Sequence, residues 1–328
     1  MISILISVKN GAVFLPACLD SIRVQSFSDW ELLIVNDHSD DGTQEILSNY
    51  ASLDPRINVY QNPGSGIIDA LHFAYQQSGG KHITRMDADD LMTARKLELM
   101  SETLVTHGPG TLAVGLVEYF SETNLGEGYK KYADWLNELT LASANFEDLY
   151  KECSIPSACW MVHREDLDRA GHFRAKVYPE DYDLAFRFRK VGLKIKPIPE
   201  VLHLWRDHAD RASRNDPHYL DNRFSELKVS HFIDFDYNAQ QPLVLWGAGQ
   251  RAKDLAKHLL KKKVNFRWIT NNKKKIGKDI YGVLIESYDL LGELEQAQVI
   301  INISATDARP MIEQAVKAHS SFAFFHFC

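Results

Sequence analysis

The first 90 residues alternate short apolar runs with segments whose apolar residues recur at helical spacing. Apolar runs at 2–8, 30–35, 57–60 and 81–86 predict buried strands, and the segments at 13–26, 43–51 and 67–77 predict helices. Strands and helices that alternate in this way form a mostly parallel sheet with helices on both faces. The sequence therefore predicts an α/β fold whose ligands bind beyond the carboxyl ends of the strands.

Length and composition are those of an ordinary globular protein. The chain has 328 residues, of which 45% are hydrophobic and 25% are charged, so we expect about two domains. The net charge of −7 argues against a nucleic-acid partner. The first ten residues lack the basic region of a signal peptide, and no apolar stretch approaches the roughly 18–20 residues of a membrane span. We expect a cytoplasmic protein, and a peripheral contact with a membrane stays open.

The distribution of charge indicates a domain boundary. Residues 241–328 contain 13 basic and 8 acidic side chains, whereas residues 1–240 contain the remaining 24 basic and 36 acidic ones. The polar segment at 236–242 between these parts is typical of a linker. We therefore predict a first domain at 1–216, a helical linker at 217–240 and a second domain at 241–328.

An acidic cluster follows the fourth predicted strand. Asp87 and Asp89 come directly after the run at 81–86, and their spacing lets both carboxylates converge on one face. Paired carboxylates at a strand end suit a hard divalent cation, Mg²⁺ or Mn²⁺, which can also hold substrate phosphates. The alternative is a solvated acidic turn that caps the helix beginning near Thr93.

A second acidic loop follows the run at 30–35. Asp37 is expected at the same edge of the sheet as Asp87, where its carboxylate can accept hydrogen bonds from a nucleobase or a ribose. We therefore favour a ligand contact for Asp37. The neighbouring residues 39–43 are better explained as a turn that caps the next helix.

A third acidic segment follows Pro179 at the start of a predicted helix. Glu180, Asp181 and Asp183 fill its first turn, where the positive end of the helix dipole favours carboxylates. This role in the helix explains the composition by itself. The alternative makes Asp181 a general base, which would have to reach the hydroxyl that it deprotonates.

The segment at 205–214 carries dense charge after an apolar run. Arg206, Arg211 and Arg214 suit a bidentate clamp on a diphosphate. His208 suits a divalent metal together with Asp89. The alternative is a salt-bridged surface loop.

Four segments, in this order, resemble family 2 glycosyltransferases. They are the opening at 3–43, the segment at 62–90 with its terminal DxD triplet, the segment at 163–192 and the segment at 202–214. The resemblance covers residues 1 to about 216 and implies the A-type glycosyltransferase (GT-A) fold in a catalytic domain. It also implies a nucleotide-diphosphate sugar donor, Mn²⁺ or Mg²⁺, and inversion of the anomeric carbon. We expect UDP as the nucleotide, and a saccharide or glycolipid of surface polysaccharide biosynthesis as the acceptor.

The same resemblance implies roles for individual residues. Asp37 would contact the base and Asp87 the ribose. Asp89, with His208, would meet the metal and the diphosphate. Asp181 would be the catalytic base, with Glu180 beside it. The other nucleotide-sugar contacts are expected from Val8, Asn10, Gly66, Ala88, Arg206 and Arg211.

The second domain opens on a predicted strand, the loop GAGQRA at 247–252 and a helix. The loop fits the G-x-G-x-x-A dinucleotide fingerprint, but the acidic residue expected about 20 positions later is absent, and Thr-Asn-Asn stands at 270–272. We predict a Rossmann-like module with a structural, oligomerising or sugar-nucleotide-sensing role. Two alternatives stay open: a nucleotide-binding oxidoreductase or sensing protein centred on this loop, and a homo-oligomer formed through this domain.

Overall fold

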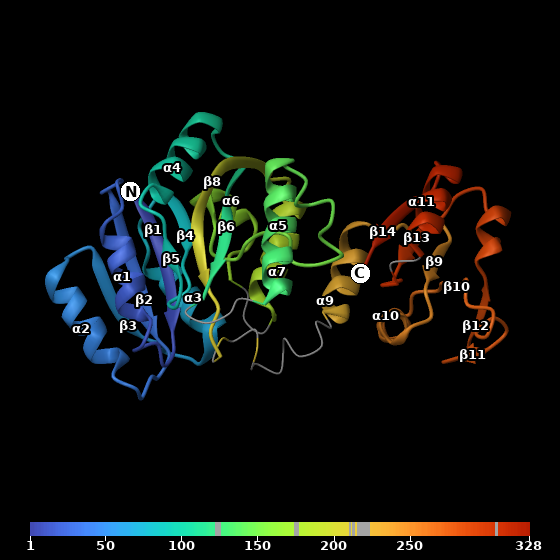
Figure 1. The fold of residues 1–328 in the computed structure, drawn as a ribbon, viewed down its shortest axis with the longest axis horizontal. Helices are drawn as coiled ribbons and strands as arrows, with labels where there is room; N and C mark the ends of the chain where they lie inside the picture. Colours follow the sequence, from blue (N-terminus) through green and yellow to red (C-terminus); the bar gives the residue numbers. More distant parts are fainter. Residues whose placement is uncertain (122–125, 174–176, 210, 212–213, 215–223, 306–307) are drawn as a thin grey trace. The chain divides into compact units, whose positions relative to one another are not determined.

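The computed structural model describes residues 1–121, 126–173, 177–209, 211, 214, 224–305 and 308–328. The chain divides into two compact units, each described here by itself (Figure 1). The first contains Met1–Glu147 and Cys153–His218, and the second contains Asp148–Glu152 and Tyr219–Cys328. The short segment at 148–152 thus groups with the second unit, although the first unit flanks it in sequence on both sides.

The first unit alternates strands and helices from its N-terminus, as the sequence predicts. Its strands are β1 (Ile2–Val8), β2 (Trp30–Asn36), β3 (Ile57–Gln61), β4 (His82–Arg85), β5 (Leu91–Met92), β6 (Thr111–Phe120), β7 (Trp160–His163) and β8 (Lys194–Arg206). Its helices are α1 (Leu15–Arg23), α2 (Thr43–Leu53), α3 (Gly66–Gln77), α4 (Lys96–His107), α5 (Glu127–Leu141), α6 (Arg164–Arg169) and α7 (Glu180–Lys190).

These strands form one sheet in the order β3-β2-β1-β4-β7-β6-β8-β5. The four strands β3, β2, β1 and β4 run parallel, and β6 runs parallel to β8, whereas β7 and β5 are antiparallel to their neighbours. The prediction of a mostly parallel sheet is therefore confirmed. The antiparallel strands β5 and β7 lie beyond residue 90, where the sequence analysis assigned no strands.

Both faces of the sheet are covered. In β1, Ile4 and Ile6 join a hydrophobic cluster that includes the apolar side of α1, whereas Leu5 points to the opposite face and is also fully buried. Helix α1 contributes side chains at i, i+3, i+4 and i+7 spacing to that cluster, which is why this segment forms an amphipathic helix. The parallel strands are near-continuous apolar runs because neither face meets water.

Register brings the carboxyl ends of the first strands together. Val8 pairs with Asn36, and Asn36 pairs with Gln61, so the loops that follow β1, β2 and β3 start at one level. The segment after β4 joins them, because the Met86 amide donates to the Leu5 carbonyl at 3.0 Å. The acidic residues that follow these strands therefore meet at one edge of the sheet.

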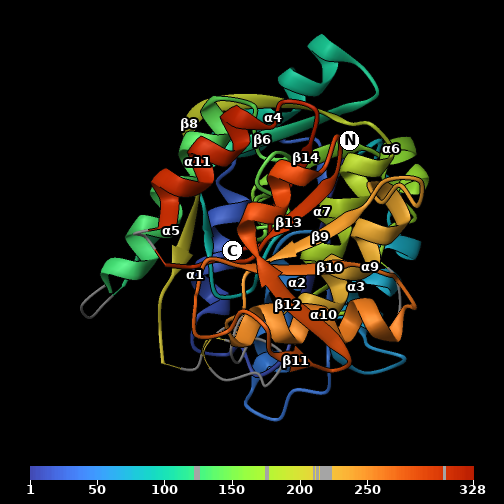
Figure 2. The same cartoon turned by 90° about the vertical axis from the view of Figure 1, so that its right-hand side faces the viewer.

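The second unit is a smaller α/β unit. Its elements are α9 (Ser225–Phe235), β9 (Leu243–Trp246), α10 (Gln250–Lys261), β10 (Arg267–Thr270), β11 (Asp279–Ile280), β12 (Val283–Ser287), the 3₁₀ helix η2 (Tyr288–Glu293), β13 (Gln298–Ile301), α11 (Arg309–Ala318) and β14 (Ala323–His326), most of which are labelled in Figure 2. The sheet order is β11-β12-β10-β9-β13-β14, and all pairs except β11–β12 are parallel. The second unit is thus an α/β unit built on a mostly parallel sheet.

Gly247 sets the turn between β9 and α10. Its φ is +135°, and a Cβ at this position would lie 2.2 Å from the carbonyl oxygen of Asn302. Only glycine avoids both the backbone strain and the overlap. The first glycine of the GAGQRA loop therefore has a structural reason, independent of any ligand.

No helix in the described parts of the chain combines the length and the apolar character needed to cross a membrane.

Candidate active site

Asp37 organises the loop that precedes α3. Its carboxylate accepts hydrogen bonds from Asn62 Nδ2 at 2.7 Å and from the Gly66 amide, which lies 3.0 Å from each oxygen. Gly66 has a φ of +84°, a conformation in which glycine alone is unstrained. Asp37 is only 5% exposed, so a buried carboxylate fixes the backbone of this loop. The sequence predicted a ligand contact for Asp37 and did not anticipate this structural task.

Val8 and Asn10 shape the same edge through their backbones. The Val8 carbonyl accepts the Asp37 amide at 2.8 Å, and its side chain is buried in the hydrophobic core. Asn10 has a φ of +52°, its amide donates to Ser39 Oγ at 2.9 Å, and its Oδ1 accepts the Asp40 amide at 3.0 Å. Both residues therefore hold the loops after β1 and β2 together.

Arg85 joins the acidic cluster after β4 to the acidic start of α7. Its guanidinium lies 2.6 Å from Asp87 Oδ1 through one nitrogen and 2.8 Å from Glu180 Oε1 through another. The Arg85 and Glu180 side chains are 4% and 3% exposed. A charge pair buried this deeply is strongly coupled, and removing one partner typically costs about 3–5 kcal/mol.

The charge of Arg85 controls the ionisation of Asp87. Burial acts to raise the pKa of Asp87, but the adjacent Arg85 charge outweighs it and holds the pKa below its usual value. The other oxygen of Asp87 accepts a weaker hydrogen bond from Ser157 Oγ at 3.3 Å. Asp87 is thus a fixed carboxylate, 27% exposed, at the carboxyl edge of the sheet.

Asp181 occupies the first turn of α7, next to Glu180. Its Oδ1 accepts the Tyr182 amide at 2.8 Å. Burial, with the nearby Glu180 charge, raises the pKa of Asp181 to about 7, against the opposing pull of Arg85. A carboxylate with a pKa near neutrality is suited to accept a proton in catalysis.

Asp89 and His208, which the sequence predicts as metal ligands, lie next to each other in the structure. His208 Nε2 lies 2.9 Å from Asp89 Oδ2, and both side chains are partly exposed. The His208 ring packs against Phe14 with ring centroids 4.4 Å apart, and its Nδ1 is buried without a hydrogen-bond partner among the described residues. Burial, together with Asp90 and Asp87, raises the pKa of Asp89. Ala88, between the two aspartates, packs against the hydrophobic core.

Arg206 and Arg211 lie against aromatic rings near this edge. Arg206 donates through Nε to the Asp89 carbonyl at 2.9 Å, with its guanidinium 4.9 Å from the Phe14 ring and 4.5 Å from the Phe120 ring. Arg211 lies 5.1 Å from the Tyr119 ring.

Arg214 is engaged elsewhere. It forms a bidentate ion pair with Asp207, with nitrogen–oxygen distances of 2.8 Å. For Arg214, the alternative of a salt-bridged loop is therefore the one that the structure favours. Residues 210, 212 and 213 of this segment lie outside the described residues.

A series of buried polar side chains lies next to Asp89 and Arg206. Lys96 contacts His203 Nδ1 at 3.2 Å, His203 Nε2 lies 2.9 Å from Asp90 Oδ2, and Asp90 Oδ1 accepts the Arg206 amide at 2.8 Å. Burial and the neighbouring Lys96 charge hold the pKa of His203 well below its usual value. The sequence analysis did not find this chain, because Lys96 and His203 look like ordinary surface residues of a helix and a strand.

The site offers two protein ligands to a divalent cation. The described part of the chain contains no group of three or more His, Cys, Asp or Glu side chains placed to hold a metal. Asp89 and His208 alone still fit Mg²⁺ or Mn²⁺, which are commonly bound through one or two protein groups and completed by water and substrate phosphates. The unpartnered Nδ1 of His208 shows that the ring is not fixed by a second hydrogen bond to the described residues.

Comparison with known proteins identifies the family of the first unit. The model of the family described as glycosyl transferase family 2 matches residues 3–171. The glycosyltransferase GlyA of Streptococcus pneumoniae is 27% identical over 225 residues, which cover 65% of this chain and 31% of that protein. The putative teichuronic acid biosynthesis glycosyltransferase TuaG of Bacillus subtilis is 28% identical over 166 residues, which cover 50% of this chain and 63% of TuaG. The chain therefore spans less than two thirds of the length of either relative.

Solved structures share the fold. S. aureus TarS 1–349, in complex with UDP-GlcNAc, matches with a TM-score of 0.58 at 14% identity, covering 79% of this chain and 71% of that one. The mannosyltransferase PcManGT from Pyrobaculum calidifontis, in complex with GDP-Man and Mn²⁺, matches with a TM-score of 0.52 at 20% identity, covering 79% and 69%. The predicted GT-A fold is confirmed.

We predict that Asp181→Asn stabilises the ligand-free protein above neutral pH. Its pKa is about 7 in the folded protein and about 3.9 in an unfolded chain, so the folded state binds more protons between these values. The free energy of unfolding therefore falls as pH rises through this window, and the asparagine removes that loss.

Urea unfolding at several pH values measures the effect. The gain should grow from little near pH 4 to about 1–3 kcal/mol near pH 8. Asp134→Asn, which changes an exposed carboxylate on α5, is the matched control. It should leave the free energy of unfolding unchanged near pH 4 and near pH 8. A variant that loses stability near pH 8 would contradict the raised pKa.

Proposed function

The chain belongs to glycosyl transferase family 2, and we propose that it transfers a sugar from a nucleotide-diphosphate donor to a saccharide or glycolipid acceptor. The catalytic domain in this proposal is residues 1–216, followed by the linker at 217–240, whose described part includes α9. The reaction is a single displacement that inverts the anomeric carbon. UDP is the proposed nucleotide, and surface polysaccharide biosynthesis is the proposed process.

One observation supports the proposal most strongly: the link through Arg85. The guanidinium contacts Asp87 on the donor side of the edge and Glu180 at the start of α7. Asp181 is the next residue of that helix, and it is close enough to Asp87 for their charges to interact. A donor that meets the carboxyl edge of the sheet would therefore have a carboxylate of near-neutral pKa beside it.

The proposed reaction moves one proton and exchanges one bond. Asp181 accepts the proton of an acceptor hydroxyl, and the hydroxyl oxygen attacks the anomeric carbon from the face opposite the diphosphate. The bond between the anomeric carbon and the diphosphate oxygen breaks, and the nucleoside diphosphate leaves with that electron pair. Inversion follows from a single displacement of this kind.

Positive charge is needed where the diphosphate leaves. Arg206 and Arg211 are the arginines proposed to bind it, since guanidinium groups pair with phosphate oxygens in bidentate fashion. Asp89 and His208 would hold Mn²⁺ or Mg²⁺, which when bound neutralises charge on the diphosphate. Asp37, Gly66, Val8, Asn10, Ala88 and Asp87 would complete the nucleotide-sugar site.

The choice of donor and acceptor draws on the relatives. TarS is solved with UDP-GlcNAc and with UDP, and PcManGT is solved with GDP-Man and Mn²⁺. TuaG is named for teichuronic acid biosynthesis. TarS supports UDP as the donor nucleotide, PcManGT supports a divalent cation as the cofactor, and TuaG supports a cell-surface polymer as the product.

We predict that UDP with Mn²⁺ stabilises the full chain against heat and that Asp89→Asn removes the Mn²⁺-dependent part. A ligand that binds only the folded state at a hundredfold excess over its Kd contributes about 2.7 kcal/mol. A thermal-shift series of UDP, GDP, CDP and ADP, each with Mn²⁺ and with EDTA, measures it.

The matched control is Asp40→Asn, an exposed carboxylate in the loop after β2. It should keep the full stabilisation by UDP and Mn²⁺. Stabilisation by GDP rather than UDP would reassign the donor nucleotide. No stabilisation by any of the four diphosphates would reject the donor site.

We also predict that Asp181→Asn lowers turnover about 10²–10⁴-fold while UDP binding stays within about twofold, because a positioned base contributes rate rather than donor affinity. In the wild type, kcat/KM should fall about tenfold per pH unit below the pKa of about 7. Asp134→Asn should leave both quantities unchanged. A variant that retains most of its turnover would move the base to Glu180 or Asp183.

A further inference from the structure

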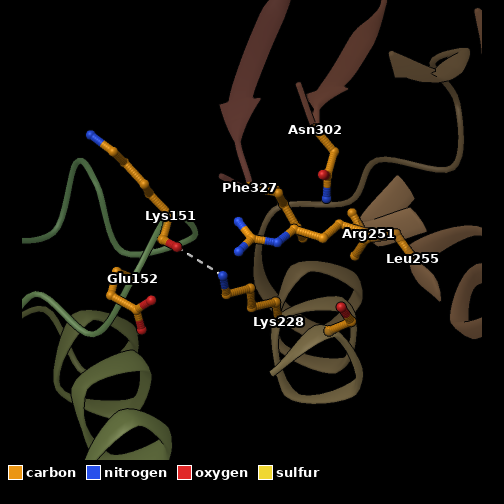
Figure 3. Close-up of a pocket in the computed structure, with 8 residues that line it drawn as sticks. Lys151, Glu152, Lys228, Arg251, Leu255, Asn302 and Phe327 are labelled. Atoms are coloured by element: carbon orange, nitrogen blue, oxygen red, sulfur yellow. Dashed lines mark hydrogen bonds between the residues drawn. The ribbon is translucent and has the colours of Figure 1, made fainter. Parts of the chain in front are cut away.

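The second unit contains a small cavity of about 70 Å³ that the proposed reaction does not use. Two basic side chains, Lys228 and Arg251, line it together with Asn302, whereas Lys151 contributes its backbone carbonyl and turns its ammonium group away (Figure 3). That ammonium group pairs with Asp148 at 3.1 Å. Leu255 and Phe327 form the apolar part of the cavity wall. All of these residues belong to the second unit, Lys151 through the inserted segment at 148–152.

The cavity lies at the point where an open parallel sheet normally binds ligands. From β9 the chain builds outward through β10 and β12 on one side, then returns to place β13 and β14 on the other side of β9. The order therefore reverses between β9 and β13, and the crevice at the carboxyl ends of such a strand pair is the usual ligand site. Asn302 directly follows β13, and Arg251 lies in the first turn of α10, after β9.

Asn302 is a buried polar group without a partner. It is 8% exposed, and its backbone amide donates to the Trp246 carbonyl at 2.8 Å. No hydrogen bond joins its side-chain amide to any residue that the structure describes, although the amide nitrogen points into the cavity toward Arg251 (Figure 3). The rest of the residue is buried, so its amide group is accessible from the cavity, where it is placed to meet a ligand.

The charges around the cavity favour an anion. Two basic side chains, Lys228 and Arg251, stand against one acidic lining residue, Glu152. Lys228 is held in place by its Nζ, which donates to the Lys151 carbonyl at 2.8 Å.

The start of α10 adds to this positive field. Helix α10 begins after Gly249, has no acidic residue in its first turn, and no described side chain caps it. Its first amides therefore keep the anion-binding character of a helix N-terminus. Lys275 adds a further positive charge at the glycine loop, where its Nζ donates to the Ala248 carbonyl.

We infer that this cavity binds the phosphate group of a small phosphorylated ligand. A water needs about 10–15 Å³ of such a cavity, whereas pockets that enclose whole ligands have about 300–1,000 Å³. The observed volume of about 70 Å³ therefore accommodates one anionic group, with the rest of the ligand in solvent. Asn302 donates to a phosphate oxygen, and Arg251 and Lys228 balance its charge.

The chemistry of the neighbouring strand argues against a dinucleotide. In NAD-binding units a carboxylate after the second strand binds the adenosine ribose. Here β10 ends at Thr270 and is followed by Asn271 and Asn272. The ligand is therefore free phosphate, a sugar phosphate or a mononucleotide. The oxidoreductase alternative is disfavoured, because the carboxylate that would bind the ribose of NAD is absent.

Calorimetric titration of the full chain with inorganic phosphate in EDTA tests the inference. The wild type should show one saturable site. Asn302→Asp, which keeps the shape and adds a negative charge, should weaken binding by about tenfold or more. Arg251→Gln, a change at an exposed position that leaves the fold intact, should weaken binding about tenfold.

Two controls separate this cavity from other anion sites. Lys253→Gln removes the same charge from the same helix outside the lining, and its affinity should stay within about twofold of the wild type. Asp89→Asn alters the proposed donor site and should leave phosphate binding unchanged. Binding that Asp89→Asn abolishes, or that neither Asn302→Asp nor Arg251→Gln weakens, would overturn the inference, as would the absence of saturable binding.

Competition identifies the source of the phosphate. UMP, glucose 1-phosphate and NAD are each titrated against bound phosphate in the wild type and in Arg251→Gln. Displacement by UMP indicates a mononucleotide as the ligand, and displacement by glucose 1-phosphate indicates a sugar phosphate. If neither displaces the bound phosphate, the ligand is free phosphate. NAD binding tighter than about 10 μM would contradict a single-phosphate site.

Discussion

The buried guanidinium of Arg85 is the interaction on which the proposed site depends. It contacts Asp87 after β4 and Glu180 at the start of α7, two carboxylates 93 positions apart in sequence. Burial alone would lower the pKa of Arg85, but the two carboxylates outweigh it and keep the side chain charged. The strand end that faces the donor and the helix that carries Asp181 are therefore fixed relative to each other by one charged group.

The remaining carboxylates at this edge are held at a cost in stability. Burial and mutual repulsion raise the pKa of Asp89 and raise the pKa values of Asp90 and Asp181 to about 7. This repulsion between carboxylates opposes folding of the ligand-free chain, and it favours the binding of cations that neutralise the negative charge. In the proposed function, a divalent cation would bring the complementary positive charge to this edge and would in turn attract the anionic diphosphate, which explains why a fold would retain so many acids in one place.

The sequence predicted the features that depend on local pattern. The parallel strands of the first unit follow from apolar runs, and the meeting of Asp37, Asp87 and Asp89 at one edge follows from strand ends that share a level. A shared metal at Asp89 and His208 was expected from the chemistry of the two side chains and from the family resemblance, and the structure places these side chains 2.9 Å apart.

Features that depend on long-range packing could not be predicted. Arg85 sits in the predicted strand next to Asp87, but nothing local indicates that Glu180 is its second partner. The chain of Lys96, His203 and Asp90 joins three distant segments. The grouping of 148–152 with the second unit has no signature in composition, although the Lys151 carbonyl holds Lys228 beside the proposed phosphate cavity.

A crystal structure of the full chain with UDP and Mn²⁺ tests the central claim most directly. The account predicts Mn²⁺ held by Asp89 and His208 beside the diphosphate of UDP, the ribose beside Asp87, and the base on the side of Asp37. Asp181 should lie on the open side of the site, facing the position of the transferred sugar. UDP held only by the second unit, or a metal that does not contact Asp89, would contradict the account.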